Sequence, residues 1–430
     1  MDVIVIGSGY AGLSVAALLA RKGYKVLVLE KSGLLGGRAA GYRDKEGFYW
    51  EYGQHSHRLG EDGPAYAVFK ALGETIDFVP GQHPPVVFYK GKLYPRPDSP
   101  LSILKSRMLS LRARVQIIRV LLKLVRAKPE DWYAKSLLDF YRANFSRLSE
   151  VEDFLNLLSF TIMVPRAEFC SAGELIDFLK KALKAKRKAG TPIGGSSQVL
   201  GKLEKIIRSN GEIVLNEEVK RIKIVNGAAV GVETDKKFYS ARAVVFAAAL
   251  DHLLSLVPES LLPEPLIEYA QTIEHTSSIM LQWVSEEPIA KTGLIMGVGI
   301  PLWGHFPTVE DPTLAPAGKH FAVFCWMLDR GKGRNPEHQA EAERNLRQAM
   351  ETMFPGFAKK VVSEKKIFVP LQNGALLKPE QSRPFRPATD AAKIKGLYLA
   401  GDTTNGEGVS GDIAFSSALK AAELIYGDLG

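Results

Sequence analysis

The chain has 430 residues, of which 46% are hydrophobic and 24% charged, a composition that is ordinary for a folded globular protein. Its length exceeds that of one typical domain, so we expect two lobes. No apolar run approaches the roughly 18 residues that a membrane-spanning helix needs. The two cysteines, Cys170 and Cys325, lack the CxxC spacing of a thiolate metal site and are too few for a disulfide framework.

Cysteine usage and charge also bear on where the protein works. Two separated cysteines fit a reducing cytoplasm, and an apolar core strand that begins at position 2 leads us to expect no signal or transit peptide. The net charge is +9, and residues 101–128 hold eight Lys or Arg and no acidic residue. This balance permits nucleic acid or an anionic membrane as a partner. Because no nucleic-acid-binding signature accompanies it, we expect no nucleic-acid partner.

The first thirty residues have the pattern of a dinucleotide-binding unit. Residues 2–6 are apolar and rich in β-branched side chains, as in a buried parallel strand, and residues 13–22 have helical periodicity. Residues 24–29 predict a second strand, which ends at Glu30. The turn between the first strand and the helix reads Gly-Ser-Gly-Tyr-Ala-Gly, so strand, glycine turn, helix, strand and acid occur in the order that the fingerprint requires.

Each residue type in this unit has a physical role. Gly7 allows a tight turn, Gly9 lets the backbone approach a pyrophosphate, and Gly12 lets helix and strand pack closely. The helix N-terminus offers N–H groups and partial positive charge to phosphates. Glu30 is suited to accept hydrogen bonds from the ribose hydroxyls. The cofactor-binding residues predicted here are Gly7, Ser8, Gly9, Tyr10, Ala11, Gly12, Glu30 and Lys31.

Two further turns follow closely. Gly36 and Gly37 again permit close backbone approach to a ligand, with the cation of Arg38 beside them, and residues 50–55 end another predicted strand in Tyr52-Gly53-Gln54-His55. His55 and His57 were weighed as metal ligands, but two histidines without a further ligand pattern predict no metal site.

The basic segment is the next organised stretch. Short strands and turns fill residues 86–94, prolines follow to position 100, and residues 102–128 are strongly helical. One interpretation is a helix that buries an apolar stripe in a second lobe, with solvated cations at its edge. The other is a basic amphipathic surface on an anionic membrane, through which a lipophilic substrate enters. The stripe consists of Leu104, Met108, Leu111, Val115, Ile118, Leu122 and Val125, and the cations beside it are Lys105, Arg112, Arg119 and Arg126.

The rest of the chain alternates helical and strand patterns up to a second glycine loop. Helices are predicted over 131–178, 200–208, 336–354 and 412–425, and strands over 211–215, 219–224, 228–232, 238–240, 243–249, 279–284, 321–326 and 396–402. The last strand ends in Gly401-Asp402, and the loop 406–411 reads Gly-Glu-Gly-Val-Ser-Gly. The other Gly-x-Gly, at 297–299, precedes Pro301, which spoils a helix start, so we expect no separate NAD(P)H lobe.

This order of motifs resembles the FAD-dependent amine oxidase and phytoene desaturase superfamily, which also contains protoporphyrinogen oxidases and carotenoid isomerases. The resemblance implies that the segment with Arg38 lies against the FAD pyrophosphate and that Gly53-Gln54-His55 borders the flavin, where the family usually has Gly-Pro or Gly-Ala. It implies that Val219 offers its backbone to adenine and that Asp402 binds the ribityl or phosphate region. In the tail, it implies backbone contact with flavin from Gly408 and Val409.

The resemblance also implies a fold. We expect an α/β protein in which a Rossmann-like FAD-binding domain, with a parallel sheet and glutathione-reductase-like topology, is interleaved with an α+β substrate domain. The FAD-binding domain would comprise residues 1–95, 191–255 and 386–430. The substrate domain would comprise a helical part, 96–190, and a sheet, 256–385. Aromatic residues expected to line its cavity are Trp283, Trp303, Phe306 and Trp326.

The function implied is that of an FAD-dependent, phytoene desaturase-like oxidoreductase. It would transfer hydride between a lipophilic, isoprenoid- or carotenoid-like substrate and flavin N5, in the cytoplasm or peripherally on the inner membrane surface. A flavin amine oxidase and a non-catalytic FAD-binding or assembly protein stay open as alternatives, and the electron acceptor is not defined. No catalytic residue is assigned, since the polar candidates Glu51, His55 and His305 are as readily structural.

Overall fold

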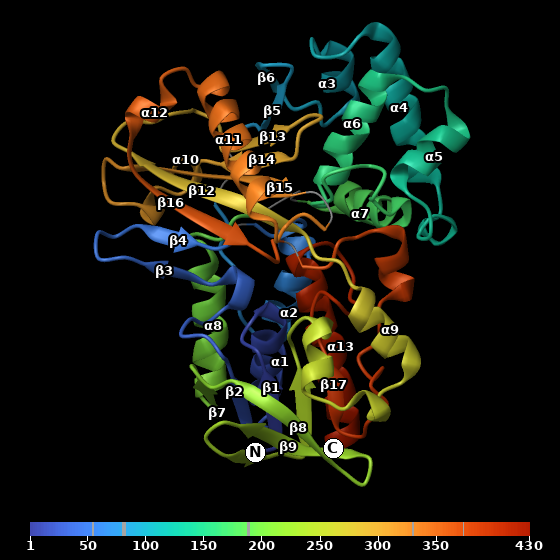
Figure 1. The fold of residues 1–430 in the computed structure, drawn as a ribbon, viewed down its shortest axis with the longest axis vertical. Helices are drawn as coiled ribbons and strands as arrows, with labels where there is room; N and C mark the ends of the chain where they lie inside the picture. Colours follow the sequence, from blue (N-terminus) through green and yellow to red (C-terminus); the bar gives the residue numbers. More distant parts are fainter. Residues whose placement is uncertain (54–55, 80–82, 187–189, 329–330, 373) are drawn as a thin grey trace.

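The computed structural model describes residues 1–53, 56–79, 83–186, 190–328, 331–372 and 374–430. Two large sheets dominate it, one in the lower and one in the upper half of Figure 1. A helical part flanks the upper sheet, and both chain termini lie at the bottom of the lower half. Among the described helices, none combines the length and apolar character needed to cross a bilayer.

The lower sheet is five-stranded and parallel, in the order β17-β11-β1-β2-β7. Its central strands are buried along their whole length, which explains why the sequence shows continuous apolar runs instead of alternation. The strands are β1 (Val3–Ile6), β2 (Val26–Leu29), β7 (Gly211–Val214), β11 (Ala243–Phe246) and β17 (Leu397–Leu399).

Helices cover one face of this sheet, and a small antiparallel meander lies against the other. The covering helices are α1 (Tyr10–Arg21), α2 (Pro64–Ala71), α8 (Ser196–Arg208) and α13 (Gly411–Leu429). The meander consists of β8 (Val219–Val225), β9 (Ala228–Thr234) and β10 (Phe238–Ser240), with α9 (Glu264–Thr272) beside it. The predicted α/β class with a parallel sheet is confirmed.

The upper sheet is seven-stranded and mixed, in the order β16-β12-β15-β14-β13-β5-β6. The strands are β5 (Val86–Tyr89), β6 (Lys92–Pro95), β12 (Ser277–Ser285), β13 (Leu294–Gly297), β14 (Leu302–His305), β15 (His320–Leu328) and β16 (Val361–Val369). One face carries α10 (Pro307–Glu310), α11 (Pro336–Met353) and α12 (Phe357–Lys360). Residues 86–95, assigned above to the first FAD-binding segment, are therefore strands of this second sheet. A hairpin of β3 (Gly41–Arg43) and β4 (Tyr49–Glu51) lies between the sheets (Figure 1).

The helical part packs on the opposite face of the seven-stranded sheet. It contains α3 (Pro100–Lys105), α4 (Leu111–Arg126), α5 (Leu137–Asn144), α6 (Ser149–Phe160) and α7 (Ala172–Lys184). Trp303 belongs to the core on this face, whereas Trp283 and Phe306 belong to the core under α11. The expectation that these aromatic residues share one cavity is wrong, because side chains alternate between the faces of a sheet.

The predicted helix over 102–128 is two helices, and its predicted buried stripe is wrong. The chain breaks after Lys105, and Ser110 starts α4 by accepting a hydrogen bond from the Ala113 N–H. The buried face of α4 consists of Ala113, Ile117, Val120 and Leu124. Of the stripe named above, Met108 is buried, Ile118 and Val125 are half-buried, and the remaining four are exposed: Leu104, Leu111, Val115 and Leu122.

Candidate cofactor-binding site

The site begins at the glycine turn after β1. Gly7 has a φ of +97°, a conformation that favours glycine. A Cβ on Gly12 would lie 2.0 Å from the Gly7 carbonyl oxygen, so only glycine lets α1 pack this closely on the strand. A Cβ on Gly9 would meet no atom within 4 Å. The turn is thus filled on its inner side and open beside Gly9, at the N-terminus of α1, where a pyrophosphate would bind.

Glu30 lies at the end of β2, beside the same turn. Its carboxylate accepts hydrogen bonds of 2.8 Å from the N–H and the hydroxyl of Ser8 and one of 2.9 Å from the Ser32 N–H. The segment with Val219 lies alongside, because the Glu217 N–H donates to the Glu30 carbonyl and the Asn216 N–H to the Ser32 carbonyl. Residues predicted to hold the ribose and the adenine are thereby brought together.

The Gly-Gly-Arg segment lies against the first turn. The Gly36 N–H donates to the Ser8 carbonyl at 3.1 Å, and a Cβ on Gly37 would lie 3.3 Å from the Gly9 Cα. Arg38 then forms an ion pair of 2.5 Å with Asp402, which is 364 residues later in the chain. The cation and the acid predicted to contact the same cofactor therefore sit side by side.

The C-terminal glycine loop completes the arrangement. Because β17 and β1 both pair with β11, Gly401 and Gly7 leave the same edge of the sheet, and both lie close to the backbone of residues 247–248. The rings of Tyr10 and Phe415 lie 4.6 Å apart, so the starts of α1 and α13 are in contact. Ser410, just before α13, has a φ of +54°, a strained conformation of the kind that clusters at ligand sites.

The other predicted residues fall into three groups. Gly408 lies against the first turn of α13, Val409 is buried beside it, and Gly53 faces the Arg38 carbonyl, with a virtual Cβ at 3.5 Å. Tyr52 is half-buried and Ala11 is buried in α1, whereas Lys31 is exposed. Gln54 and His55 lie outside the described residues.

Glu51 and His305, two of the polar catalytic candidates, and His57, considered above as a metal ligand, have structural contacts. The Glu51 carboxylate accepts a hydrogen bond of 2.7 Å from the Ser196 N–H and so holds the start of α8. His57 is buried among the rings of Tyr10 and Phe415, and burial lowers its pKa to about 4, so it stays neutral. His305 lies in β14, with its ring 5.1 Å from that of Trp303.

Two parts of the site were missed in the sequence. A Cβ on Gly374 would lie 1.5 Å from a carboxylate oxygen of Asp402, so Gly374 contacts the Arg38–Asp402 pair directly. Asp412, in the first turn of α13, is buried, with one carboxylate oxygen that has no hydrogen-bond partner among the described residues. Gly374, which follows β16, is a turn signal that could have indicated the first of these parts. No sequence pattern marks Asp412.

These contacts define one elongated site that both ends of the chain build. Glycine backbones, two helix N-termini and an acid at each end are the donor set that an adenine dinucleotide requires. A Cβ on Gly9 would meet nothing within 4 Å, and one on Gly401 would meet only the Ala248 carbonyl oxygen, at 3.7 Å, so the backbone of both turns is open to a ligand and the residues present fit the group. The protein is thus of the class that binds a dinucleotide across the carboxyl edge of a parallel sheet.

Comparison with known proteins specifies this class. Residues 10–426 match the family described as flavin containing amine oxidoreductase. Prolycopene isomerase from Daucus carota is 23% identical over an alignment 514 positions long, which covers 100% of this chain and 80% of the relative. 15-cis-phytoene desaturase from Narcissus pseudonarcissus is 46% identical over 55 residues, which cover 13% of this chain and only 10% of the desaturase.

Solved structures share the fold along nearly the whole chain. An oxidoreductase from Methanosarcina mazei superimposes with a TM-score of 0.82 at 23% identity, covering 98% of this chain and 100% of its own. Putrescine oxidase with bound putrescine superimposes with a TM-score of 0.71 at 15% identity, covering 100% and 98%. The chain belongs to the flavin-containing amine oxidoreductase family, and it is an FAD-dependent oxidoreductase.

The buried carboxyl of Asp412 makes the stability of this region depend on pH. Burial raises its pKa to about 7, although Arg58 and a hydrogen bond from the Val409 backbone oppose the shift. An unfolded aspartate titrates near pH ~3.9, so between about pH 4 and 7 the folded protein binds more protons than the unfolded one. Stability therefore falls as the pH rises through this window.

We expect Asp412→Asn to stabilise the protein at pH ~8 by roughly 3 kcal/mol, and much less at pH ~4.5, because asparagine carries no charge to bury. Urea unfolding at the two pH values measures the difference. Asp390→Asn is the control, since Asp390 is exposed and paired with Lys393. An equal gain for Asp412→Asn at both pH values would contradict the assignment.

Proposed function

We propose that this oxidoreductase acts on a lipophilic, isoprenoid- or carotenoid-like substrate. When bound, FAD supplies a centre that exchanges hydride with a substrate C–H. The chain's own contribution is to hold the substrate against the cofactor cleft and to exclude water from it. The observation that carries the proposal is the apolar wall that the seven-stranded sheet forms against the helical part and that reaches the C-terminal glycine loop.

This wall is one face of the seven-stranded sheet. It presents sulfur-containing and aromatic side chains toward the helical part, and the same core continues to Val409 and Ile413 at the C-terminal glycine loop. The wall residues are Met280, Met296, Trp303, Cys325 and Met327. Methionine is flexible and polarizable, so it adapts to a long hydrocarbon better than branched side chains do.

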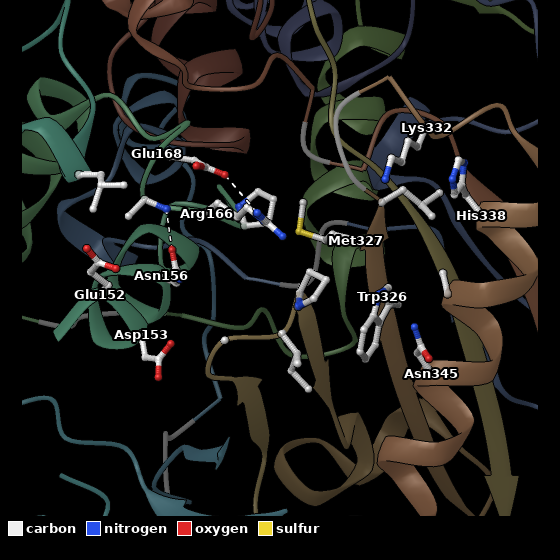
Figure 2. Close-up of a pocket in the computed structure, with 18 of the residues that line it drawn as sticks. Glu152, Asp153, Asn156, Arg166, Glu168, Trp326, Met327, Lys332, His338 and Asn345 are labelled. Carbon is white, nitrogen blue, oxygen red and sulfur yellow. Dashed lines mark hydrogen bonds and ion pairs between the residues drawn. The ribbon is translucent and has the colours of Figure 1, made fainter. Parts of the chain in front are cut away.

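A cavity of about 570 Å³ opens between α6 and α11 beside this wall (Figure 2). It extends to Met327 and Leu328 at the end of β15, which pair with Ser278 and Ser277 of β12. Thr276, next along the chain, is hydrogen-bonded to both Gln372 and Gly374, which contact the cofactor cleft. The paired strands thus connect the cavity with residues that contact the cofactor site, and we propose it as the substrate entrance; most of the side chains that line it are polar or charged.

An amine oxidase is the second candidate, because acidic side chains at this cavity resemble a site for an ammonium group. Most of them already have partners, however. Glu152 pairs with Arg147 at 3.0 Å, Glu168 pairs with Arg166 at 3.1 Å, and Asp153 accepts a hydrogen bond from the Tyr89 hydroxyl. Figure 2 shows the Arg166–Glu168 pair within the cavity. An amine would therefore compete with existing contacts, which counts against the second candidate.

The test is anaerobic reduction of the purified flavoprotein. A carotenoid or polyprenyl compound in micelles is expected to bleach the visible flavin absorbance, whereas putrescine and an L-amino acid are expected to leave it unchanged. Asn345→Trp, which narrows the cavity, should slow the bleaching, whereas Arg344→Trp, on the exposed side of the same helix, should not. Bleaching by the amines alone would overturn the proposal in favour of the second candidate.

A further inference from the structure

The outer surface of α3 and α4 carries exposed apolar side chains next to exposed cations. Figure 1 places these helices at the outer edge of the helical part, away from the five-stranded sheet. Fifteen large apolar side chains are exposed among the described residues, and five of them lie within residues 101–122. Single exposed leucines are ordinary, but a cluster of them marks an interaction surface.

The exposed apolar residues of α4 form one line along the helix. Leu111, Val115 and Leu122 are 70%, 48% and 48% exposed. Their spacings of four and seven residues place them on one side of a helix with 3.6 residues per turn. This side is opposite the buried face of Ala113, Ile117, Val120 and Leu124, so the exposure is a property of the fold and not of a loosely attached helix.

A line of cations runs beside the apolar line. Arg112, Arg119 and Arg126 recur every seven residues, and all three are exposed. Within the described part of the chain, none of the three forms an ion pair with a carboxylate. Since residues 101–128 contain no acid, the charge of this line is not compensated along the segment. Glu150 faces the start of α4, where its carboxylate accepts hydrogen bonds from the N–H and the hydroxyl of Ser110.

We infer that this surface, Leu111, Val115 and Leu122 with Arg112, Arg119 and Arg126, docks on an anionic lipid bilayer. An apolar stripe flanked by arginines matches an interface in which acyl chains lie next to negative headgroups. A second copy of the chain would cover the leucines but would bring the same arginines face to face, because a two-fold interface pairs a patch with itself. A nucleic acid would match the arginines but not the leucines. The inference does not depend on which substrate the flavin site takes.

The contacts of α4 also connect this surface with the cavity. The Gln116 side chain donates hydrogen bonds of 2.9 Å to the Tyr141 hydroxyl and 2.6 Å to the Ser146 carbonyl, and the next residue, Arg147, lines the cavity. Docking through α4 would therefore bring the side of the cavity that the helical part forms close to the bilayer.

Vesicle flotation tests the inference with the holoprotein. Vesicles are made of phosphatidylcholine alone or of an equimolar mixture with phosphatidylglycerol, at low and at physiological salt. We expect binding to the anionic vesicles that weakens with salt, and none to phosphatidylcholine. Replacing the three arginines together (Arg112→Gln, Arg119→Gln, Arg126→Gln) should lower affinity about a hundredfold, and replacing the apolar residues together (Leu111→Ser, Val115→Ser, Leu122→Ser) should lower it by at least about tenfold.

Matched controls remove the same number of positive charges, or of exposed apolar side chains, elsewhere on the surface. Lys25→Gln, Lys205→Gln and Lys395→Gln remove the same charge, and Leu261→Ser, Val362→Ser and Leu424→Ser remove exposed apolar side chains. Both control triples should bind vesicles like the wild type. Flavin content and circular dichroism confirm that each variant is folded.

A single labelled cysteine gives a second readout that needs no triple variant. Both native cysteines are fully buried, so an environment-sensitive dye attaches selectively to Val115→Cys or, as the control, to Leu424→Cys. A blue shift on anionic vesicles at position 115 alone supports the inference. It is overturned by absence of binding, by equal binding of all variants, by a dimer that the apolar triple abolishes, or by duplex DNA binding that only the arginine triple abolishes.

Discussion

Gly12→Ala is expected to destabilise the protein by about 3 kcal/mol or more and to leave it without FAD. The added Cβ would lie 2.0 Å from the Gly7 carbonyl oxygen, a backbone atom that cannot move without displacing β1 or α1. The same contact fixes the turn that faces the pyrophosphate. Thermal unfolding of the apoprotein and the visible absorbance of the purified protein measure the two effects.

Gly9→Ala is the matched variant, because it separates folding from cofactor binding. A Cβ there meets nothing within 4 Å, and the φ of −66° is one that alanine adopts readily. The apoprotein should keep its unfolding temperature. FAD affinity should fall by about tenfold or more, which is ~1.4 kcal/mol or more, since the methyl group occupies the open side of the turn. Normal FAD affinity in Gly9→Ala would contradict the placement of the pyrophosphate.

Glu174→Ala is the second variant with a large expected effect, about 3–5 kcal/mol of stability. Glu174 of α7 and Arg386 form an ion pair of 3.0 Å in which the side chains are 3% and 0% exposed. Removing the carboxylate leaves the guanidinium buried without its counter-charge. It also removes the acceptor for the Arg383 N–H, which lies 2.6 Å away.

This ion pair joins the helical part to the C-terminal glycine loop, because Arg386 also donates to the Gly406 carbonyl at 3.1 Å. We therefore expect Glu174→Ala to weaken FAD binding as well. Urea unfolding and FAD titration measure these effects. Glu407→Ala is the control: its pair with Lys181 is half-exposed, so it should cost less than about 1 kcal/mol. A similar cost for the two variants would show that burial of the Glu174 pair has no special importance.

How far the sequence predicts the fold depends on how local the signal is. The turn at residues 7–12, Glu30 and the last glycine loop could be predicted because glycine spacing and strand periodicity act over a few residues. That these three segments lie at one site could not be derived from their spacing, and this prediction rested on a family resemblance. Gln372 and Gly374 are brought to the site by the register of β12 with β15 and β16, which no local pattern reports.

The segment with α4 shows a different limit. Leu111, Val115 and Leu122 follow one another at four and seven residues, and Ile117, Val120 and Leu124 at three and four. Both sets form a line along one side of a helix, so periodicity alone cannot tell which line is buried. Which side of α4 is buried depends on its packing against α6, α7 and the core beneath them. Asp412 shows the converse, because a polar residue at a helix start is ordinary in sequence, and its burial arises only when the loop at Gly408 folds over it.

The position of β17 at the edge of the parallel sheet has a consequence for synthesis on the ribosome. β11 is apolar and buried along its whole length, and one of its two neighbours is β17, which begins at Leu397. Until residues 397–411 have been synthesised, one edge of β11 lacks its neighbouring strand and is open to pairing with other chains. Synthesis of this segment therefore both covers that edge and supplies the second part of the flavin-binding site, so protection from aggregation and the capacity to bind the prosthetic group arise in the same step.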